Sequence, residues 1–260
     1  MPDVEKPIGT PDLGKIDLFL LRHALRLAWA DMRSAPQFGF FFAAIYIVIG
    51  WGVAYVAYST GQTYWMVLAI AGFPILGPFA AVGLYEVSHR LDLGISLNWS
   101  EVLQVILHQR KRQLPSISAV IILILLFWFF LGHMIFALFL GLSVMTNISS
   151  SLDVYFTTNG LMMLGVGTIV GAAFSMLVYM ISVISLPLLL DREVDFVTAM
   201  ITSFETVLQN FPVMFGWALF IAVCTFVAMI PAFLGLLLVM PLFGHASWHI
   251  YRLARDNGPE

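Results

Sequence analysis

Six apolar runs of about 20 residues recur along the chain, and runs of this length suffice to cross the hydrocarbon core of a bilayer as helices. The runs are Phe38–Tyr58, Tyr64–Tyr85, Ile117–Leu138, Leu161–Ser185, Val213–Ile230 and Ala232–Ile250. The last two are separated only by Pro231. The pattern predicts an all-α membrane protein with six transmembrane helices.

Three amphipathic stretches with helical spacing precede the pairs of runs, and each ends just before a proline. They are Ile16–Arg33, Trp99–Leu114 and Val194–Phe211. The third has the clearest apolar stripe. Its members are Val197, Met200, Ile201, Phe204, Leu208 and Phe211. Such a helix can lie in the headgroup region with one face in lipid, or it can pack onto the ends of the spans, and the sequence favours neither.

This arrangement recurs three times, over residues 16–90, 97–192 and 194–252. The second span of each pair holds a proline, and an ionisable residue follows eight positions later. The prolines are Pro78, Pro187 and Pro241, and the ionisable residues are Glu86, Asp195 and His249. The pattern predicts three parallel repeats, each an interfacial helix followed by a transmembrane hairpin. The alternative is that any chain that alternates loops and spans would align in this way.

All 12 Lys and Arg residues fall on one side of the predicted topology. They are Lys6, Lys15, Arg22, Arg26, Arg33, Arg90, Arg110, Lys111, Arg112, Arg192, Arg252 and Arg255. Because positive residues are retained on the cytoplasmic side of a membrane, we expect both termini in the cytoplasm. A flexible arm (residues 1–15) and a tail (residues 253–260) would then flank a single membrane domain (residues 16–252).

The composition supports this class. A hydrophobic share of 60% with 10% charged residues lies far from the values of soluble domains. A net charge of -3 gives no reason to expect a nucleic-acid partner. The single cysteine, Cys224, lies inside an apolar run and excludes a disulfide within the chain. The expected partners are therefore the lipid bilayer and other membrane proteins.

Ionisable side chains within the membrane are the first candidates for a functional site. His133, deep in the third run, is either a proton relay or metal ligand, or a neutral imidazole bonded to a carbonyl or hydroxyl group; the second interpretation is favoured. His245 and His249 have the i, i+4 spacing of two metal ligands. They also suit an interfacial belt beside Trp248, which is again favoured, so no cofactor is predicted.

A candidate polar site gathers at the cytoplasmic ends of the spans. Its members are Glu86, His89, Asp191 and Asp195, with His133 as a deeper member. Glu86 precedes Arg90 by four residues, which predicts an ion pair along one helix.

Backbone features of the spans suggest kinks and contacts. Pro74, Gly77 and Pro78 interrupt the second run, and the carbonyl groups that they free could line a cavity. Pro187 and Pro241 predict further kinks. A stripe of small residues, Gly167, Gly171 and Ser175, would let another helix approach the fourth span closely.

Three motifs resemble the DUF2189 family of predicted bacterial integral membrane proteins of unknown function. They are ADMRSAP at residues 30–36, GPFAAVGLYEVSHR at residues 77–90 and LVMPLFGHASWHIYR at residues 238–252. The resemblance runs from about residue 16 to residue 252 and implies a bacterial inner-membrane protein. Some relatives are labelled as components of cytochrome c oxidase, but the family supplies no functional residues that could be transferred to this chain.

Two functions follow from these observations. The first is a non-enzymatic inner-membrane protein that packs against other membrane proteins, as an accessory or assembly component of a respiratory complex. The second is a small transporter or channel with a site near the broken second span. We expect no enzyme, because the chain contains no phosphate loop, nucleophile elbow or zinc-protease motif.

Overall fold

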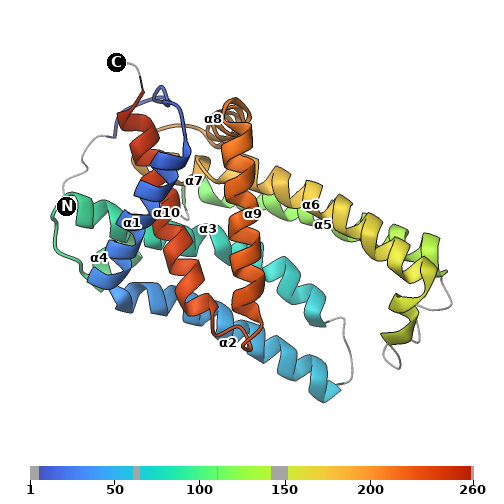
Figure 1. The fold of residues 1–260 in the computed structure, drawn as a ribbon. Helices are drawn as coiled ribbons and strands as arrows, with labels where there is room; N and C mark the ends of the chain where they lie inside the picture. The colour runs from blue at the N-terminus through green and yellow to red at the C-terminus, as the bar shows by residue number, and fades with distance from the viewer. Residues whose placement is uncertain (1–5, 61–64, 110, 142–151, 259–260) are drawn as a thin grey trace. The chain divides into compact units, whose positions relative to one another are not determined.

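The computed structural model describes residues 6–60, 65–109, 111–141 and 152–258, with only the backbone described for residues 65–76 and 152 (Figure 1). These residues are helical apart from loops and one isolated parallel bridge between Ile8 and Glu193. The helices are α1 (Leu18–Ser34), α2 (Pro36–Thr60), α3 (Trp65–Asp92), α4 (Trp99–Gln109), α5 (Leu114–Leu140), the short 3-10 helix η2 (Leu152–Phe156), α6 (Thr158–Ser182), α7 (Ser185–Asp191), α8 (Phe196–Gln209), α9 (Phe211–Met229) and α10 (Leu236–Asp256). The predicted all-α class is confirmed.

Four segments among the described residues are long and apolar enough to cross a membrane. They are Pro36–Thr60, Leu114–Leu140, Thr158–Asp191 and Phe211–Met229. They correspond to the first, third, fourth and fifth of the six predicted spans. For most of the predicted second span, Tyr64–Tyr85, the structure describes no side chains, since only the backbone of residues 65–76 is described.

The predicted sixth span differs from the structure at its start. The hydropathy pattern predicts that this span begins at Ala232, but residues 232–235 form turns and α10 begins at Leu236. Ala232 and Phe233 adopt φ angles of 51° and 68°, in the left-handed region, which cannot continue a right-handed helix. The rest of α10 carries several ionisable residues, and it is not among the four candidate spans.

The prolines interrupt the helices less than expected. The backbone of α3 remains helical through Pro74 and Pro78, and α10 contains Pro241 in its interior. The break between α6 and α7 falls at residues 183–184, ahead of Pro187. A proline ring clashes with the carbonyl group four residues earlier, which places the disturbance at Val183.

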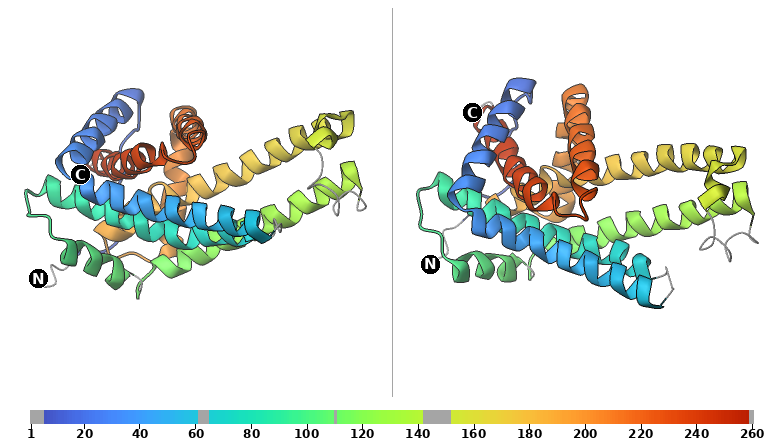
Figure 2. Two further views of the ribbon diagram at one scale, coloured as in Figure 1. Left: turned by 90° about the horizontal axis from the view of Figure 1, so that it is seen from below. Right: turned by 60° about the horizontal axis from the view of Figure 1, so that its bottom comes forward.

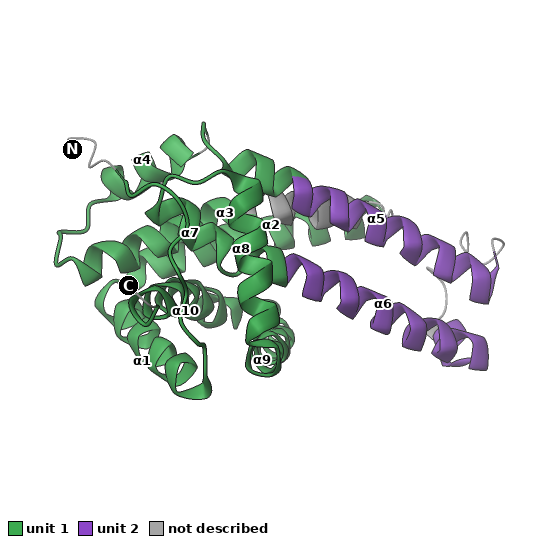
Figure 3. Ribbon diagram, turned by 90° about the horizontal axis from the view of Figure 1, so that it is seen from above, with its two compact units in different colours: residues 1–119, 180–260 green, residues 120–179 purple. Residues whose placement is uncertain are grey.

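The described chain divides into two compact units (Figure 3). Unit 1 comprises residues 1–119 and 180–260, and unit 2 comprises residues 120–179. Within unit 1, α2 and α3 run side by side, and both contact α10 (Figure 2). Two glycines permit close approach to α10 and α2. A Cβ at Gly39 would lie 2.9 Å from Cβ of Pro241, and one at Gly83 would lie 2.3 Å from Cζ of Phe42.

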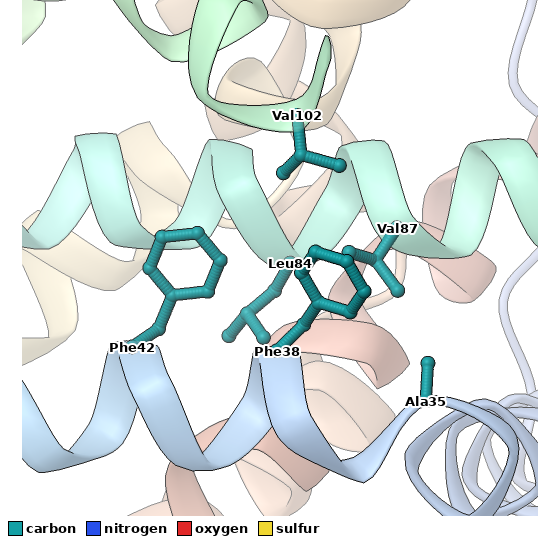
Figure 4. Close-up of a cluster of buried hydrophobic side chains, with 6 residues drawn as sticks. All are labelled: Ala35, Phe38, Phe42, Leu84, Val87 and Val102. Atoms are coloured by element: carbon teal, nitrogen blue, oxygen red, sulfur yellow. The ribbon is translucent and has the colours of Figure 1, made fainter. Parts of the chain in front are cut away.

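A cluster of buried apolar side chains joins α2, α3 and α4 (Figure 4). Its members are Ala35, Phe38, Phe42, Leu84, Val87 and Val102. Phe38 also stacks on Trp99 at the start of α4, with ring centroids 4.0 Å apart. The amphipathic helix α4 is therefore held to the ends of α2 and α3 by its apolar residues.

The other two amphipathic helices turn their apolar faces in opposite ways. The apolar face of α1 packs along α10, and Ala24 and Ala28 are fully buried. In α8 the small and polar side buries Ala199 and Ser203, while Val197, Ile201 and Leu208 of the predicted stripe are about half exposed. An outward apolar stripe of this kind suits a helix that lies in the headgroup region.

The chain before α1 is tied to other parts of unit 1. The backbone amide of Gly9 donates to the Glu193 carbonyl at 3.0 Å, and that of Gly14 donates to the Ala254 carbonyl at 2.7 Å. The amide of Ile16 donates to the Asn210 side chain at 3.0 Å. These bonds link the arm to the α7–α8 loop, to the end of α8 and to α10.

Unit 2 contains the larger parts of α5 and α6, which contact each other through few side chains. Trp128 packs against Phe174, with ring centroids 6.1 Å apart. A Cβ at Gly171 would lie 3.0 Å from the Trp128 ring, whereas no described atom would lie within 4 Å of a Cβ at Gly167. Within the stripe of Gly167, Gly171 and Ser175, the Trp128 indole ring therefore packs on Gly171. The atoms nearest to Gly171 belong to this side chain and not to the backbone of another helix.

Candidate functional site: a buried polar network on α10

The second half of α10 carries polar side chains on several faces, and six of them meet a partner from α1, α3 or α7. We call this set the α10 network. It consists of His245, Trp248, His249, Tyr251, Arg252 and Arg255 on α10, with Asp31 on α1, Ser88 and Asp92 on α3, and Asp191 on α7. All of these elements belong to unit 1.

His249 and Asp31 form a buried pair between α10 and α1. The His249 side chain is fully buried, and its Nε2 lies 2.7 Å from Oδ2 of Asp31. Since a carboxylate only accepts hydrogen bonds, the imidazole donates from Nε2. Its Nδ1 lies 3.9 Å from Oδ2 of Asp92 and has no hydrogen-bond partner among the described residues. The ring thus lies between two carboxylates.

His245, one turn earlier on α10, faces α3 instead. Its Nδ1 lies 2.7 Å from Oγ of Ser88, and both residues are fully buried. Its Nε2 has no hydrogen-bond partner among the described residues. The two histidines therefore share a helix but reach different partners, His245 on α3 and His249 on α1.

Asp92, at the end of α3, contacts two residues of α10. The indole Nε1 of Trp248 donates a hydrogen bond to Oδ2 at 3.0 Å, and Nη1 of Arg252 forms an ion pair with Oδ1 at 2.5 Å. Trp248 is 1% exposed, and its indole packs edge-on against His89, with ring centroids 5.0 Å apart. A single carboxylate thus anchors one face of α10 to α3.

Asp191, at the end of α7, binds two side chains from the last turns of α10. The Tyr251 hydroxyl donates to Oδ2 at 2.7 Å, and Nη1 of Arg255 donates to the same oxygen at 2.9 Å. Burial, and next the negative charge of Asp191, raise the pKa of Tyr251. The phenol therefore stays protonated and remains a donor.

A second ion-pair cluster lies beside the network, between α3 and α4. Nε of Arg90 donates to Oε1 of Glu86 at 2.6 Å, which confirms the predicted i, i+4 pair. Nη1 of the same guanidinium contacts the Glu101 carboxylate and also donates to the Ser96 carbonyl at 3.4 Å. Glu86 and Arg90 are only 6% and 4% exposed. Arg90 therefore fixes α4 onto α3 while it neutralises a buried carboxylate.

The electrostatics of this region favour a neutral His89. Burial lowers the pKa of His89, and the negative charges of Glu86, Asp191 and Asp92 oppose that effect only in part. His89 thus lies among the predicted site residues, and its ring serves as a packing surface for Trp248. The structure brings Glu86, His89 and Asp191 into one neighbourhood.

Two other predicted site residues lie elsewhere. Asp195 is exposed and caps α8, where its Oδ1 accepts from the backbone amides of Val197 and Thr198 at 3.0 and 2.9 Å. His133 lies in unit 2 and is exposed within the chain; its Nδ1 lies 2.8 Å from the carbonyl oxygen of Phe129 on the same helix. A bond to a carbonyl group is the interpretation that the sequence favoured for His133.

The chemistry that this arrangement can support is limited by burial. Ser88 and His245 have the side chains of a nucleophile and a base, but both are sealed from solvent. The described residues contain no group of three or more His, Cys, Asp or Glu side chains arranged to hold a metal ion. Buried polar pairs of this kind join helices, since each unpaired partner would carry the cost of desolvation.

Two pockets are lined by residues outside the α10 network. One, of about 280 Å³, lies beside Arg112 and Arg192, and the other, of about 370 Å³, lies beside Phe139 and Thr157. Neither is lined by Gly77 or Pro78, where the sequence suggests a cavity.

Sequence reasoning missed Asp31, Ser88 and Asp92 as members of the network. For Asp31 a signal was available, because it follows Ala24 and Ala28 at helical spacing on the apolar face of α1, where a carboxylate needs a partner. Ser88 and Asp92 follow the last apolar turns of α3, and their spacing alone indicates no partner.

The family comparison agrees with the membrane class. Residues 66–191 match the model of a family described as predicted integral membrane protein (DUF2189). The matched segment includes the second of the three motifs, at residues 77–90, whereas the motifs at residues 30–36 and 238–252 lie outside it. No curated protein and no solved structure matches the chain.

Proposed function

Residues 66–191 match the model of the DUF2189 family of predicted integral membrane proteins, and we propose that the chain is a non-enzymatic protein that acts through helix contacts with other membrane proteins. In this proposal unit 1 is a rigid base and the apolar hairpin of unit 2, α5 with α6, is the docking element. The observation that carries the proposal is the exposure of large apolar side chains on the hairpin, above all on α5.

In unit 1 the α10 network and the Glu86–Arg90–Glu101 cluster join the helices to one another. The hairpin is different. Only 6% of the most apolar window of Leu114–Leu140 is buried within the chain. Its large exposed side chains include Leu126, Phe127, Phe130 and Leu138. In a bilayer such a surface meets lipid chains or the helices of another protein.

Gly167 on α6 favours a protein partner at one place on this surface. A Cβ there would meet no described atom within 4 Å. Small residues at such a place let a second helix approach closely, and helix association in membranes depends on this kind of packing. Lipid chains gain nothing comparable from a missing side chain.

Gly167→Leu is expected to weaken partner binding without harming the fold, because the added side chain enters open space in the chain but blocks a close helix contact. We expect the amount of the main partner that co-purifies in mild detergent to fall about tenfold, equivalent to ~1.4 kcal/mol. Quantitative mass spectrometry of the eluted complex measures this.

The matched control is Ile169→Phe, which adds bulk to another face of α6, at a side chain that is 72% exposed. It should retain the partner at the wild-type level. Elution of the wild-type protein as a monodisperse chain without a stoichiometric partner would refute the docking proposal, as would equal recovery of the partner with Gly167→Leu.

We further propose that α3 and α10 complete six crossings, so that both termini lie in the cytoplasm of a bacterial inner membrane. The support is the distribution of the 12 Lys and Arg residues, all of which would then lie on one side. The threefold repeat of hairpins belongs to the same proposal, since α2 with α3, α5 with α6, and α9 with α10 would be its three pairs.

Single cysteines should separate this topology from one in which α10 does not cross. In a Cys224→Ser background, Ser59→Cys should react with a membrane-impermeant maleimide in intact bacterial cells, and Asp256→Cys should react only after permeabilisation. If α10 does not cross while the other five segments do, the chain end moves to the outside. Asp256→Cys would then label in intact cells.

The partner class that we propose, a respiratory complex with this chain as an accessory or assembly component, rests on the family resemblance alone. The co-purification experiment tests it directly, because subunits of such a complex would be identified by mass.

A further inference from the structure

The pocket of about 280 Å³ lies where two candidate spans reach their polar ends. Arg112 and Gln113 line it just before the span Leu114–Leu140 begins, and Arg192 lines it just after the span Thr158–Asp191 ends. Residues that directly flank a span lie at the depth of the lipid headgroups. All the lining residues belong to unit 1.

Two guanidinium groups in this pocket have donors to spare. Arg112 contacts Glu193 through one nitrogen, Nη2. Nε of Arg192 is buried without a hydrogen-bond partner among the described residues, and the nearest carboxylate oxygen, Oδ2 of Asp191, is 3.9 Å away. Since a guanidinium carries five N–H donors in a planar fork that matches phosphate oxygens, both side chains can still bind an anion.

The same pocket also contains two carboxylates, Glu193 and Asp195. The hydrogen bond from Arg112 holds the pKa of Glu193 below its usual range, and hydrogen bonds from Thr198 do the same for Asp195. Both groups are therefore ionised at neutral pH. Each carboxylate can accept about four hydrogen bonds, so each can still accept from a cation.

The charges that line the pocket balance, with two guanidinium and two carboxylate groups. Lys6 lies outside the lining, and its ammonium donates to the Leu190 carbonyl. A simple anion would meet the carboxylates, and a simple cation would meet the guanidinium groups. A zwitterion that carries a phosphate and an ammonium group satisfies both kinds of side chain.

We propose that this pocket binds the headgroup of an aminophospholipid, with the phosphate on Arg112 and Arg192 and the primary ammonium on Glu193 and Asp195. The volume lies just below the ~300–1,000 Å³ of typical small-molecule sites, which suits a headgroup whose acyl chains remain in the bilayer. The site is remote in sequence from Gly167, and its only premise is that the chain is inserted in a membrane.

Native mass spectrometry of the full-length protein in detergent tests this site with three lipids. Phosphatidylethanolamine should be retained most. Phosphatidylcholine has the same phosphate but no N–H donor, and phosphatidylglycerol has no ammonium group, so both should be retained several-fold less. Arg192→Gln should lower the retention of phosphatidylethanolamine about tenfold, and Val194→Phe, which fills the pocket without a change of charge, should do the same.

The control is Arg26→Gln, which removes an exposed cation of α1 outside the pocket and should bind as the wild type does. If Arg192→Gln does not elute as a folded protein in size-exclusion chromatography, the lipid retention of Val194→Phe tests the proposal instead. Wild-type retention in the pocket variants, or equal retention of the three lipids, overturns the proposal. Displacement of the lipid by equimolar soluble phosphoethanolamine would assign the pocket to a free solute and overturn the lipid assignment.

Discussion

Replacement of Arg90 by alanine is expected to destabilise unit 1 by about 3–5 kcal/mol, the usual cost of breaking a buried ion pair by removing one partner. The cost is large because Glu86, 6% exposed, would keep a buried carboxylate without its cation. The second carboxylate, Glu101, is more exposed and can turn to water. Loss of the contact between Arg90 and Glu101 therefore adds little to the destabilisation. Thermal unfolding in detergent, followed by circular dichroism, measures the effect.

Two variants show whether the effect comes from the buried charge. Arg90→Lys keeps a cation but cannot contact both carboxylates with a planar fork, so it should be of intermediate stability. Glu86→Gln combined with Arg90→Ala should recover much of the loss, because the buried carboxylate is then absent. An Arg90→Ala protein as stable as Arg26→Ala, a change at an exposed position, would show that the cluster does not hold α4 to α3.

Replacement of Trp248 by alanine should cost a similar ~3–5 kcal/mol, through a cavity and a lost hydrogen bond. Trp248 is one of the largest fully buried side chains, packs against His89 and donates to Asp92. Its removal would loosen the contact between α10 and α3. The same unfolding measurement applies, with the native-state mobility of α10 followed by hydrogen exchange.

Trp248→Phe separates the two contributions, since it keeps most of the ring volume and loses the indole N–H. It should cost about 1 kcal/mol, the usual net contribution of one hydrogen bond, because the Asp92 side chain is 17% exposed and can also bind water. Asp92 would also still be bound by Arg252 at 2.5 Å. Equal losses for the Phe and Ala variants would mean that packing contributes nothing at this position, contrary to the burial of the ring.

These two side chains illustrate how far sequence reasoning reaches. The Glu86–Arg90 pair was predictable, because both residues lie on one helix and i, i+4 neighbours always face the same side. The contact between Trp248 and Asp92 spans 156 residues and depends on how α10 packs against α3. The sequence alone favours an interfacial belt for Trp248, because that expectation depends on the residue type and not on its neighbours in space.

The amphipathic helices make the same point. The sequence predicted the starts of α1, α4 and α8 to within two residues, because helical periodicity is a local property, but α4 ends at Gln109 and not at the predicted Leu114. Which side each helix presents to the protein was not predictable. The face of α8 that packs inward carries Ala199, Ser203 and Thr206, since the Ser203 hydroxyl donates to the Met180 carbonyl and its Oγ accepts from the Ile184 amide.

The sequence by itself determined that this is a helical membrane protein, where most of its helices lie, and which residues pair within one helix. Hydropathy and helical spacing act over neighbouring residues, so they can be interpreted without a fold. Only the tertiary structure decided that Asp31 meets His249, 218 residues away, and that Arg112 and Arg192 line one pocket with Glu193. The physical reason is that a buried polar group needs a partner, and packing alone selects which distant side chain supplies it.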